Sequence, residues 1–239
     1  MCNINITINP HTSGISMSQK LRSRLLEIFN RLLKYYGPQG WWPASDPLEI
    51  ILGAILVQGT NWKNAEKAIN ELKKHGLVDL GSLSDTSKKK LAEIIKPAGF
   101  YSVKATRIKN FIEKLFFEFN GDLQALLDLD IKKLREFLLS IGGIGKETAD
   151  NIILYAADKP VFPVDNYTVR LFSRLGITQT KNYDKLRNLI EKNLPKDIKI
   201  YKEFRALIVR HCKTYCKKQP LCSNCPLASI CAQKIKKEL

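Results

Sequence analysis

The chain has 239 residues, and 44% of them are apolar, which suits a soluble globular protein of one large domain or two small ones. Lysine and arginine number 39 against 23 aspartate and glutamate residues, so the formal net charge is +16. This excess favours a polyanionic partner, but it does not choose among DNA, RNA and an anionic membrane surface. No apolar run approaches the roughly 18 residues that span a bilayer, so we expect no membrane-spanning segment.

Helical periodicity predominates along the chain and strand-like alternation is almost absent, which predicts an all-α fold. The polar residues 1–18 are interpreted as a flexible N-terminal extension. In chain order, helices are predicted at 19–36, 47–58, 62–74, 86–96, 103–119, 131–140, 146–157, 166–175, 183–193 and 199–215.

A glycine-rich hairpin is predicted between the helices at 131–140 and 146–157. Gly143 and Gly145 permit backbone conformations that a Cβ would hinder, and the helix after Gly145 would present unpaired N–H groups outward. Such a turn, together with the charge of Lys146, can hold a phosphate without reading a base. The plainer interpretation is an ordinary helical hairpin with a glycine turn.

Asp165 follows Pro163 and Val164 and precedes the helix predicted at 166–175. An aspartate at that position caps the helix, which is worth about 1 kcal/mol and requires no catalytic role. A carboxylate at a helix N-terminus can also stabilise a cationic sugar as a base departs, and it can orient an attacking water molecule.

The three tryptophans of the chain lie near two predicted loops. Trp41 and Trp42 precede Pro43, and Trp62 follows the turn that begins at Gln58. Tryptophan is usually well buried, so these side chains could simply anchor a core. Indole faces also bind a cationic base by stacking and cation–π attraction, which is worth about 0.5 to 2 kcal/mol.

Four cysteines crowd into residues 216–231 with intervals of five, two and five residues: Cys216, Cys222, Cys225 and Cys231. Thiolates in so short a span would repel one another unless a metal neutralised them. The spacing alone fits zinc and a [4Fe–4S] cluster equally well. Cys212 lies outside this pattern and is interpreted as a spare thiol.

The hairpin, the Val-Asp pair and the cysteine loop follow one another in an order that resembles the endonuclease III-like helix-hairpin-helix DNA glycosylases. The resemblance runs from about Leu21 to Cys231. The Trp-Trp-Pro loop, the tryptophan after the Gln58 turn and the Gly-Ile-Gly-Lys-Glu string are most similar to the monofunctional 3-methyladenine DNA glycosylase branch of that superfamily.

The resemblance implies a role for each of these residues. Asp165 would be the catalytic carboxylate, and Gln58 would fill the gap that the extruded nucleotide leaves. The damaged base would be bound by Trp41, Trp42, Pro43 and Trp62, and the DNA backbone by Gly143, Gly145, Lys146, Lys217 and Lys218. The four cysteines would hold a [4Fe–4S] cluster, although the first interval is one residue shorter than the family's.

Glu147 occupies the position where bifunctional members of that family carry a nucleophilic lysine. Lys146 lies one residue earlier, and one step on a helix turns a side chain by about 100°. The resemblance therefore implies water as the nucleophile and little lyase activity. In a different register of the turn, Lys146 would enter the pocket.

The resemblance also implies a bilobal fold, with one helical domain at 46–158 and a second lobe formed by 19–45 and 159–239. We expect a monomeric cytoplasmic protein that acts on double-stranded DNA containing a damaged base. Two rival hypotheses stay open, namely a glycosylase and lyase for oxidised, deaminated or mismatched pyrimidines, and a DNA-binding iron–sulfur protein without catalysis.

Overall fold

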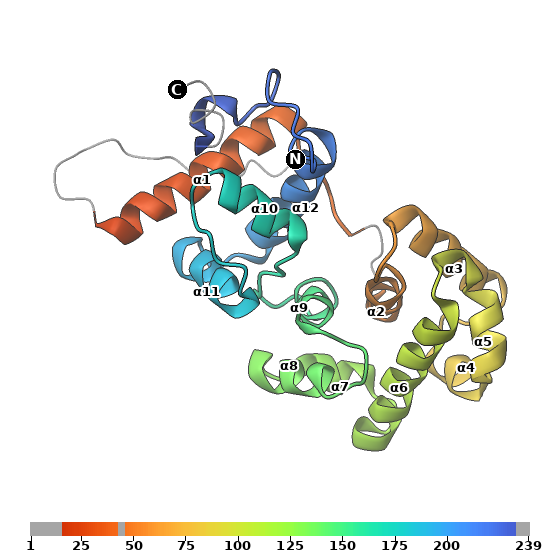
Figure 1. Ribbon diagram of the computed structural model, residues 1–239. Helices are drawn as coiled ribbons and strands as arrows, with labels where there is room; N and C mark the ends of the chain where they lie inside the picture. Colours follow the sequence, from red (N-terminus) through yellow and green to blue (C-terminus); the bar gives the residue numbers. More distant parts are fainter. Residues whose placement is uncertain (1–15, 43–45, 233–239) are drawn as a thin grey trace. The chain divides into compact units, whose positions relative to one another are not determined.

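The computed structural model describes residues 16–42 and 46–232, and within these ranges the chain forms helices and no β-strand. The predicted all-α class is confirmed. The described residues divide into two compact units, one formed by Trp42–Pro163 and the other by the segments up to Trp41 and from Val164 onward (Figure 1). The sequence placed the corresponding limits of the first unit at 46 and 158.

The unit Trp42–Pro163 contains the hairpin. Asp46 caps its central helix α2, and Pro47 fills the first helical position, where a proline costs no hydrogen bond. The helices are α2 (Pro47–Leu56), α3 (Trp62–Lys74), α4 (Leu80–Asp85), α5 (Lys88–Ile94), the 3₁₀ turn η1 (Lys96–Ala98), α6 (Tyr101–Phe119), α7 (Leu123–Asp128), α8 (Ile131–Leu139) and α9 (Lys146–Tyr155).

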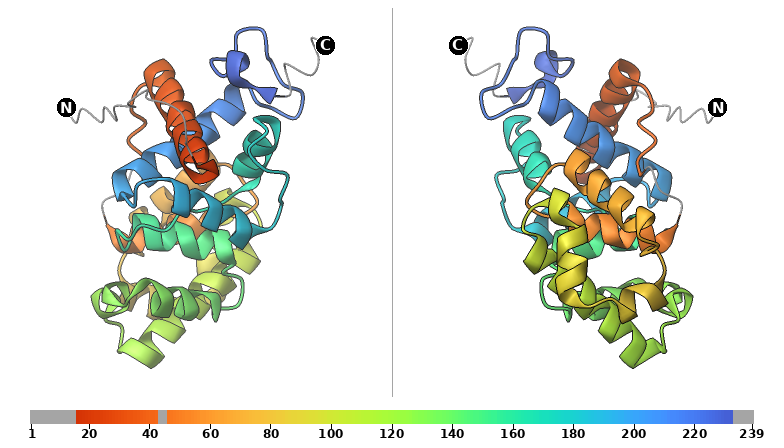
Figure 2. Two further views of the ribbon diagram at one scale, coloured as in Figure 1. Left: turned by 90° about the vertical axis from the view of Figure 1, so that its left-hand side faces the viewer. Right: turned by 90° about the vertical axis from the view of Figure 1, so that its right-hand side faces the viewer.

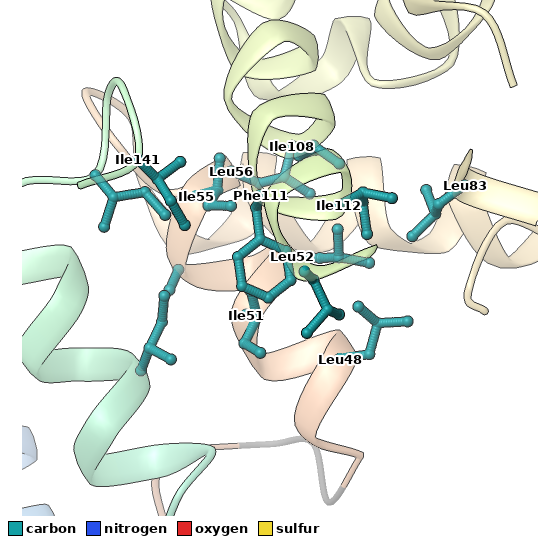
Figure 3. Close-up of a cluster of buried hydrophobic side chains, with 14 of the residues drawn as sticks. Leu48, Ile51, Leu52, Ile55, Leu56, Leu83, Ile108, Phe111, Ile112 and Ile141 are labelled. Atoms are coloured by element: carbon teal, nitrogen blue, oxygen red, sulfur yellow. The ribbon is translucent and has the colours of Figure 1, made fainter. Parts of the chain in front are cut away.

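Helix α2 is buried on nearly all sides, and it packs against α3, α6 and α9. Its Ile51 and Leu52 point toward Phe111 of α6 in the centre of the hydrophobic cluster (Figure 3). Helices α8 and α9 pack against each other and contribute Leu138 and Ile152 to the same cluster. The loops that leave α2 and join α8 to α9 are therefore attached to one core.

The other unit contains Asp165 and the cysteine loop. Its helices are α1 (Met17–Tyr36), α10 (Asn166–Arg174), α11 (Tyr183–Asn193), α12 (Ile198–Thr214) and the 3₁₀ turn η2 (Ala228–Ile230). Helix α12 packs against α1 and α10, and both views of Figure 2 show α1 beside α12 and inclined to it. The Phe204 ring meets those of Phe29 and Phe172 in this core, with centroid distances of 5.6 and 6.4 Å respectively.

Three local predictions differ from the structure. Residues 16–18 are not part of an extension, because Ser16 and Gln19 form a reciprocal capping box and α1 begins at Met17. Two short helices, α4 and α7, were not predicted, and each is started by an aspartate cap, Asp79 and Asp122. Thr86 ends α4 instead of starting the next helix. No helix in the described ranges is both long and apolar enough to cross a membrane.

Candidate functional site

The glycine-rich hairpin that the sequence predicted joins α8 to α9. Gly143 has φ +93°, a left-handed conformation that favours glycine. Gly145 has an ordinary extended conformation with φ −88°, so the expectation that it also needs special backbone freedom is wrong. It is the N-cap of α9 without a side-chain cap, and no atom lies within 4 Å of where its Cβ would be. The first turn of α9 is thus left sterically open.

The charged residues after this turn are exposed. Lys146 and Glu147 occupy the first turn of α9 and both lie at the surface. The two helices are joined below the turn by an ion pair that the sequence did not reveal, Arg135 Nε to Asp150 Oδ1 at 2.7 Å. This pair has one completely buried partner, Asp150. The hairpin, cross-linked by this ion pair, therefore carries a glycine turn with the exposed Lys146 beside it.

Gln58 lies against this hairpin and does not project freely into solvent. Its Nε2 donates to the Gly143 carbonyl at 3.1 Å and to Thr148 Oγ1 at 2.8 Å. Its Oε1 accepts from Arg107 Nη1 of α6. These hydrogen bonds join the loop at 57–61, which we call the glutamine loop, to the glycine turn at 140–145 within one unit.

An aromatic cluster packs against Gly53, the glycine of helix α2. The rings of Trp42 and Trp62 meet edge to face, with centroids 4.9 Å apart, and Tyr155 of α9 lies 5.2 Å from Trp42. A Cβ on Gly53 would lie 3.0 Å from the Trp42 ring and 3.4 Å from the Trp62 ring. Glycine at 53 thus permits both indoles to approach the backbone of α2. Trp41 is 37% exposed, and the predicted contact Pro43 lies outside the described residues.

Phe100 is a candidate that sequence reasoning missed. Its side chain is 72% exposed, and its backbone has φ 49°, a left-handed conformation that is costly for a residue with a bulky side chain. The ring lies beside the glutamine loop, 3.7 Å from where a Cβ on Gly59 would be. A strained and exposed aromatic residue next to this loop is unlike an ordinary surface phenylalanine. Only the Gly99-Phe100 pair before α6 could have signalled it from sequence.

Asp165 is the N-cap of α10, and its carboxylate is almost fully enclosed. Oδ1 accepts from the backbone N of Thr168 at 2.7 Å and from its hydroxyl at 2.8 Å. Oδ2 lies 3.0 Å from Nη1 of Arg205 on α12, and the two side chains are only 7% and 8% exposed. The capping role that the sequence suggested is therefore present, and a buried ion pair that it did not suggest accompanies it.

Thr168 and Arg205 together orient the Asp165 carboxylate. A carboxylate has about four acceptor sites, and Thr168 uses both of those on Oδ1, while Oδ2 faces Arg205 and keeps acceptor capacity. Such a group can hold one water molecule or face a positive charge with little reorganisation. The site therefore presents a negative charge in a fixed orientation.

The four predicted metal ligands line one apolar cavity of about 150 Å³, together with Leu171, Leu175 and Leu227. Within residues 16–42 and 46–232, no three histidine, cysteine or acidic side chains converge closely enough to form a metal site. The cavity nevertheless brings Cys216, Cys222, Cys225 and Cys231 to one place, and thiols around an apolar space fit an iron–sulfur cluster or zinc.

The surroundings of the cysteine thiols give them different pKa values. A hydrogen bond with Cys212 and then one from Arg174 lower the pKa of Cys216 to about 6, whereas burial raises the pKa of Cys225 to about 11. Cys212 is buried, and its Sγ is 3.6 Å from the Tyr167 carbonyl. Burial lowers the pKa of His211 to about 4, so its imidazole is neutral near pH 7. His211 Nε2 lies 3.7 Å from Cys225 Sγ.

Two of the three lysines predicted to bind DNA, Lys217 and Lys218, are exposed on the cysteine loop. Arg174 donates to the carbonyls of Lys217 at 2.6 Å and of Lys218 at 2.9 Å. It also donates to Cys216 Sγ at 3.3 Å. The same arginine therefore fixes the cysteine loop and the backbone that carries both cations.

Known proteins are similar to this chain over most of its length. The family description "HhH-GPD superfamily base excision DNA repair protein" matches residues 52–196. A protein of Methanocaldococcus jannaschii described as a candidate DNA repair glycosylase is 49% identical over 91% of this chain and 100% of its own length. A thymine/uracil-DNA glycosylase of Pyrobaculum aerophilum is 29% identical over 87% of this chain and 91% of its own length.

Among solved structures, the H. pylori 3-methyladenine DNA glycosylase bound to 1,N6-ethenoadenine is similar, with a TM-score of 0.69 and 29% identity. The similarity covers 82% of this chain and 97% of that one. The chain therefore belongs to the HhH-GPD superfamily of base excision DNA repair proteins.

Proposed function

We propose that the protein is a monofunctional DNA glycosylase that hydrolyses the N-glycosidic bond of alkylated purines such as 3-methyladenine in double-stranded DNA. The observation that carries this proposal is the enclosed Asp165 carboxylate, oriented by Thr168 and Arg205. The aromatic cluster and the similarity to a 3-methyladenine DNA glycosylase support the choice of base.

The hairpin turn would hold the DNA backbone. The uncapped N-terminus of α9 offers N–H groups to a phosphate, and Lys146, Lys217 and Lys218 add positive charge at exposed positions. Phe100 would enter the base stack beside the glutamine loop as an aromatic wedge, which helps to extrude the target nucleotide.

The extruded base would then meet the tryptophans. N3-alkylated adenine carries a positive charge, so indole faces attract it and it departs readily without a general acid. The Asp165 carboxylate would stabilise the positive charge that develops on the sugar, and its remaining acceptor site on Oδ2 would orient the attacking water. Arg205 and Thr168 keep this anion in one orientation throughout.

The cysteine loop would hold a [4Fe–4S] cluster through Cys216, Cys222, Cys225 and Cys231. The cluster would supply structural cross-links for the loop that carries Lys217 and Lys218. No step of base removal requires it.

The experiment that tests the proposed function is to incubate the protein with methylated duplex DNA and to identify the released bases by chromatography. We expect intact 3-methyladenine in the soluble fraction. Release of only uracil, thymine or oxidised pyrimidines, from parallel duplexes that carry those lesions or mismatches, would favour the rival pyrimidine glycosylase. The similarity to a thymine/uracil-DNA glycosylase supports that rival.

The absence of a lysine at position 147 predicts that no Schiff base forms with the sugar. Borohydride should therefore trap no covalent complex with lesion-containing DNA, because only an amine nucleophile leaves a reducible adduct. The variant Glu147→Lys provides the matched control, since it places an amine at that position. A trapped complex with the unaltered protein that disappears in Lys146→Gln would show that Lys146 enters the pocket.

Replacing one cluster ligand should remove the metal. We expect purified Cys222→Ser to lose the visible absorbance and the iron of the unaltered protein, and to melt at a lower temperature. Cys212→Ser, which changes a thiol outside the predicted ligand set, should keep its iron. Elemental analysis that finds one zinc in place of four irons would show that zinc occupies the site.

Phe100 offers a test in which stability and DNA binding change in opposite directions. Glycine adopts φ 49° without strain, so Phe100→Gly should raise the free energy of unfolding by about 1 kcal/mol. The same change removes the ring and should weaken binding to lesion-containing duplex about tenfold, because stacking is worth about 1 to 3 kcal/mol per base. Urea unfolding and fluorescence anisotropy measure the two effects, and Phe100→Tyr should keep the affinity.

A further inference from the structure

The Gln58 side chain is held against the hairpin by hydrogen bonds. In the structure its amide is used at both ends, by Arg107 on Oε1 and by the Gly143 carbonyl and Thr148 hydroxyl on Nε2. In the role that the resemblance to the glycosylases implies, which we add here to the proposed function, the same side chain fills the space of an extruded nucleotide. If it cannot make these contacts and fill a gap in the duplex at the same time, its hydrogen bonds to Gly143, Thr148 and Arg107 must break first.

Arg107 is the group best placed to control this exchange. Its side chain lies across the glycine turn, and a Cβ on Gly143 would be 2.5 Å from its Cγ and Nε. It therefore occupies the space that the glycine leaves free. A guanidinium donating to an amide oxygen is a charge-assisted hydrogen bond, which is stronger than the two neutral bonds that Gln58 donates.

The base of the loop is fixed independently of Gln58. Lys104, which is completely buried, donates to the carbonyl of Leu56 at 2.8 Å and to that of Ala98 at 2.8 Å. Gly59, on the other side of Gln58, has φ +66° and is exposed. Lys104 thus holds the backbone where the loop begins, directly before Val57 and Gln58, without contacting the Gln58 side chain.

We propose that Arg107 is a positioning residue that latches Gln58 on the hairpin and keeps it out of the duplex until the latch is released. This inference rests on the proposed function, because it assigns a release step to the loop that enters DNA. The latch adds a cost to nucleotide extrusion and none to binding of an intact duplex through its backbone. Weakening the latch therefore shifts bound DNA toward the extruded state.

The test compares affinity for two duplexes, one intact and one with a tetrahydrofuran abasic analogue opposite 2-aminopurine. Anisotropy gives both dissociation constants, and 2-aminopurine fluorescence reports unstacking in the complex. Arg107→Met should increase the preference for the abasic duplex about tenfold, the factor expected for one charge-assisted hydrogen bond. Arg107→Lys, which keeps a cationic donor, should show a smaller increase. Lys73→Met, which removes a charge from α3, should leave the preference unchanged.

A double-mutant cycle separates latching from a purely structural role. In a Gln58→Ala background, Arg107→Met should have no further effect on the preference, because nothing is left to latch. An equal effect of Arg107→Met with and without Gln58 would overturn the proposal, and so would an unchanged or reduced preference in Arg107→Met itself. Melting temperatures of all variants identify any that fail to fold, and Arg107→Lys then carries the same cycle.

Failure of the latch and failure of the proposed function give different results. If the unaltered protein does not prefer the abasic duplex, extrusion and the latch are both refuted. If it does prefer that duplex and Arg107→Met changes nothing, the latch alone is refuted.

Discussion

Asp165→Asn is expected to reduce the single-turnover rate of base release by at least about 10³-fold while leaving DNA affinity within about twofold. Asparagine has nearly the same shape, and its carbonyl oxygen can still accept from Thr168. It carries no charge, so it cannot stabilise the cationic sugar. The measurement is release of a labelled base with protein in excess, together with anisotropy on the same duplex.

The matched control for this change is Asp197→Asn. Asp197 caps α12 in the same unit, where it accepts from the backbone N atoms of Lys199 and Ile200, and it is exposed. The substitution therefore makes the same chemical change at a helix cap without touching the proposed site. A comparable loss of base release in both variants would show that capping, and not the charge of Asp165, is what the rate depends on.

Arg205→Met is expected to destabilise the protein by about 3 to 5 kcal/mol, which lowers the melting temperature by roughly 10 °C. Arg205 and Asp165 are nearly fully buried, so removing the guanidinium leaves a carboxylate without its counter-charge. Base release should also fall, because the carboxylate loses the group that orients it. Urea unfolding and single-turnover release measure the two effects.

The double variant Asp165→Asn with Arg205→Met should recover part of the lost stability, because no unpaired charge remains in the core. Arg210→Met is the control on the same helix. Arg210 is exposed and donates to the Tyr36 carbonyl and to Gln39 Oε1, so its removal should cost less than about 1 kcal/mol. Stability losses of equal size in Arg205→Met and Arg210→Met would contradict a buried ion pair.

The sequence predicted those helices whose apolar stripes are long enough to dominate local preference. The helices α3 and α11 begin and end at the predicted residues, and an asparagine side chain caps the start of each one. The short helices α4 and α7 were missed, since six residues give too little periodicity to separate a helix from a loop. The glycine at 145 was misjudged because residue type alone does not determine φ.

The candidate site was predictable only where its residues are close together in sequence. Asp165 and the cysteines were proposed from local motifs, whereas Arg205 lies far along the chain from Asp165 and is brought to it by packing of α12 on α10. Arg107 and Tyr155 were missed for the same reason, because their partners Gln58 and Trp42 come from distant segments. Such contacts depend on tertiary packing, which a single sequence does not display.

A crystal structure of the protein with a duplex that contains a pyrrolidine analogue of the cationic sugar would show directly whether the Asp165 carboxylate faces the sugar of the extruded nucleotide. We expect the Asp165 carboxylate to lie within hydrogen-bond distance of the pyrrolidine nitrogen while the Thr168 backbone N still donates to Oδ1. A complex in which the analogue is extruded from the duplex but lies away from Asp165, with the carboxylate enclosed by Arg205 alone, would contradict it.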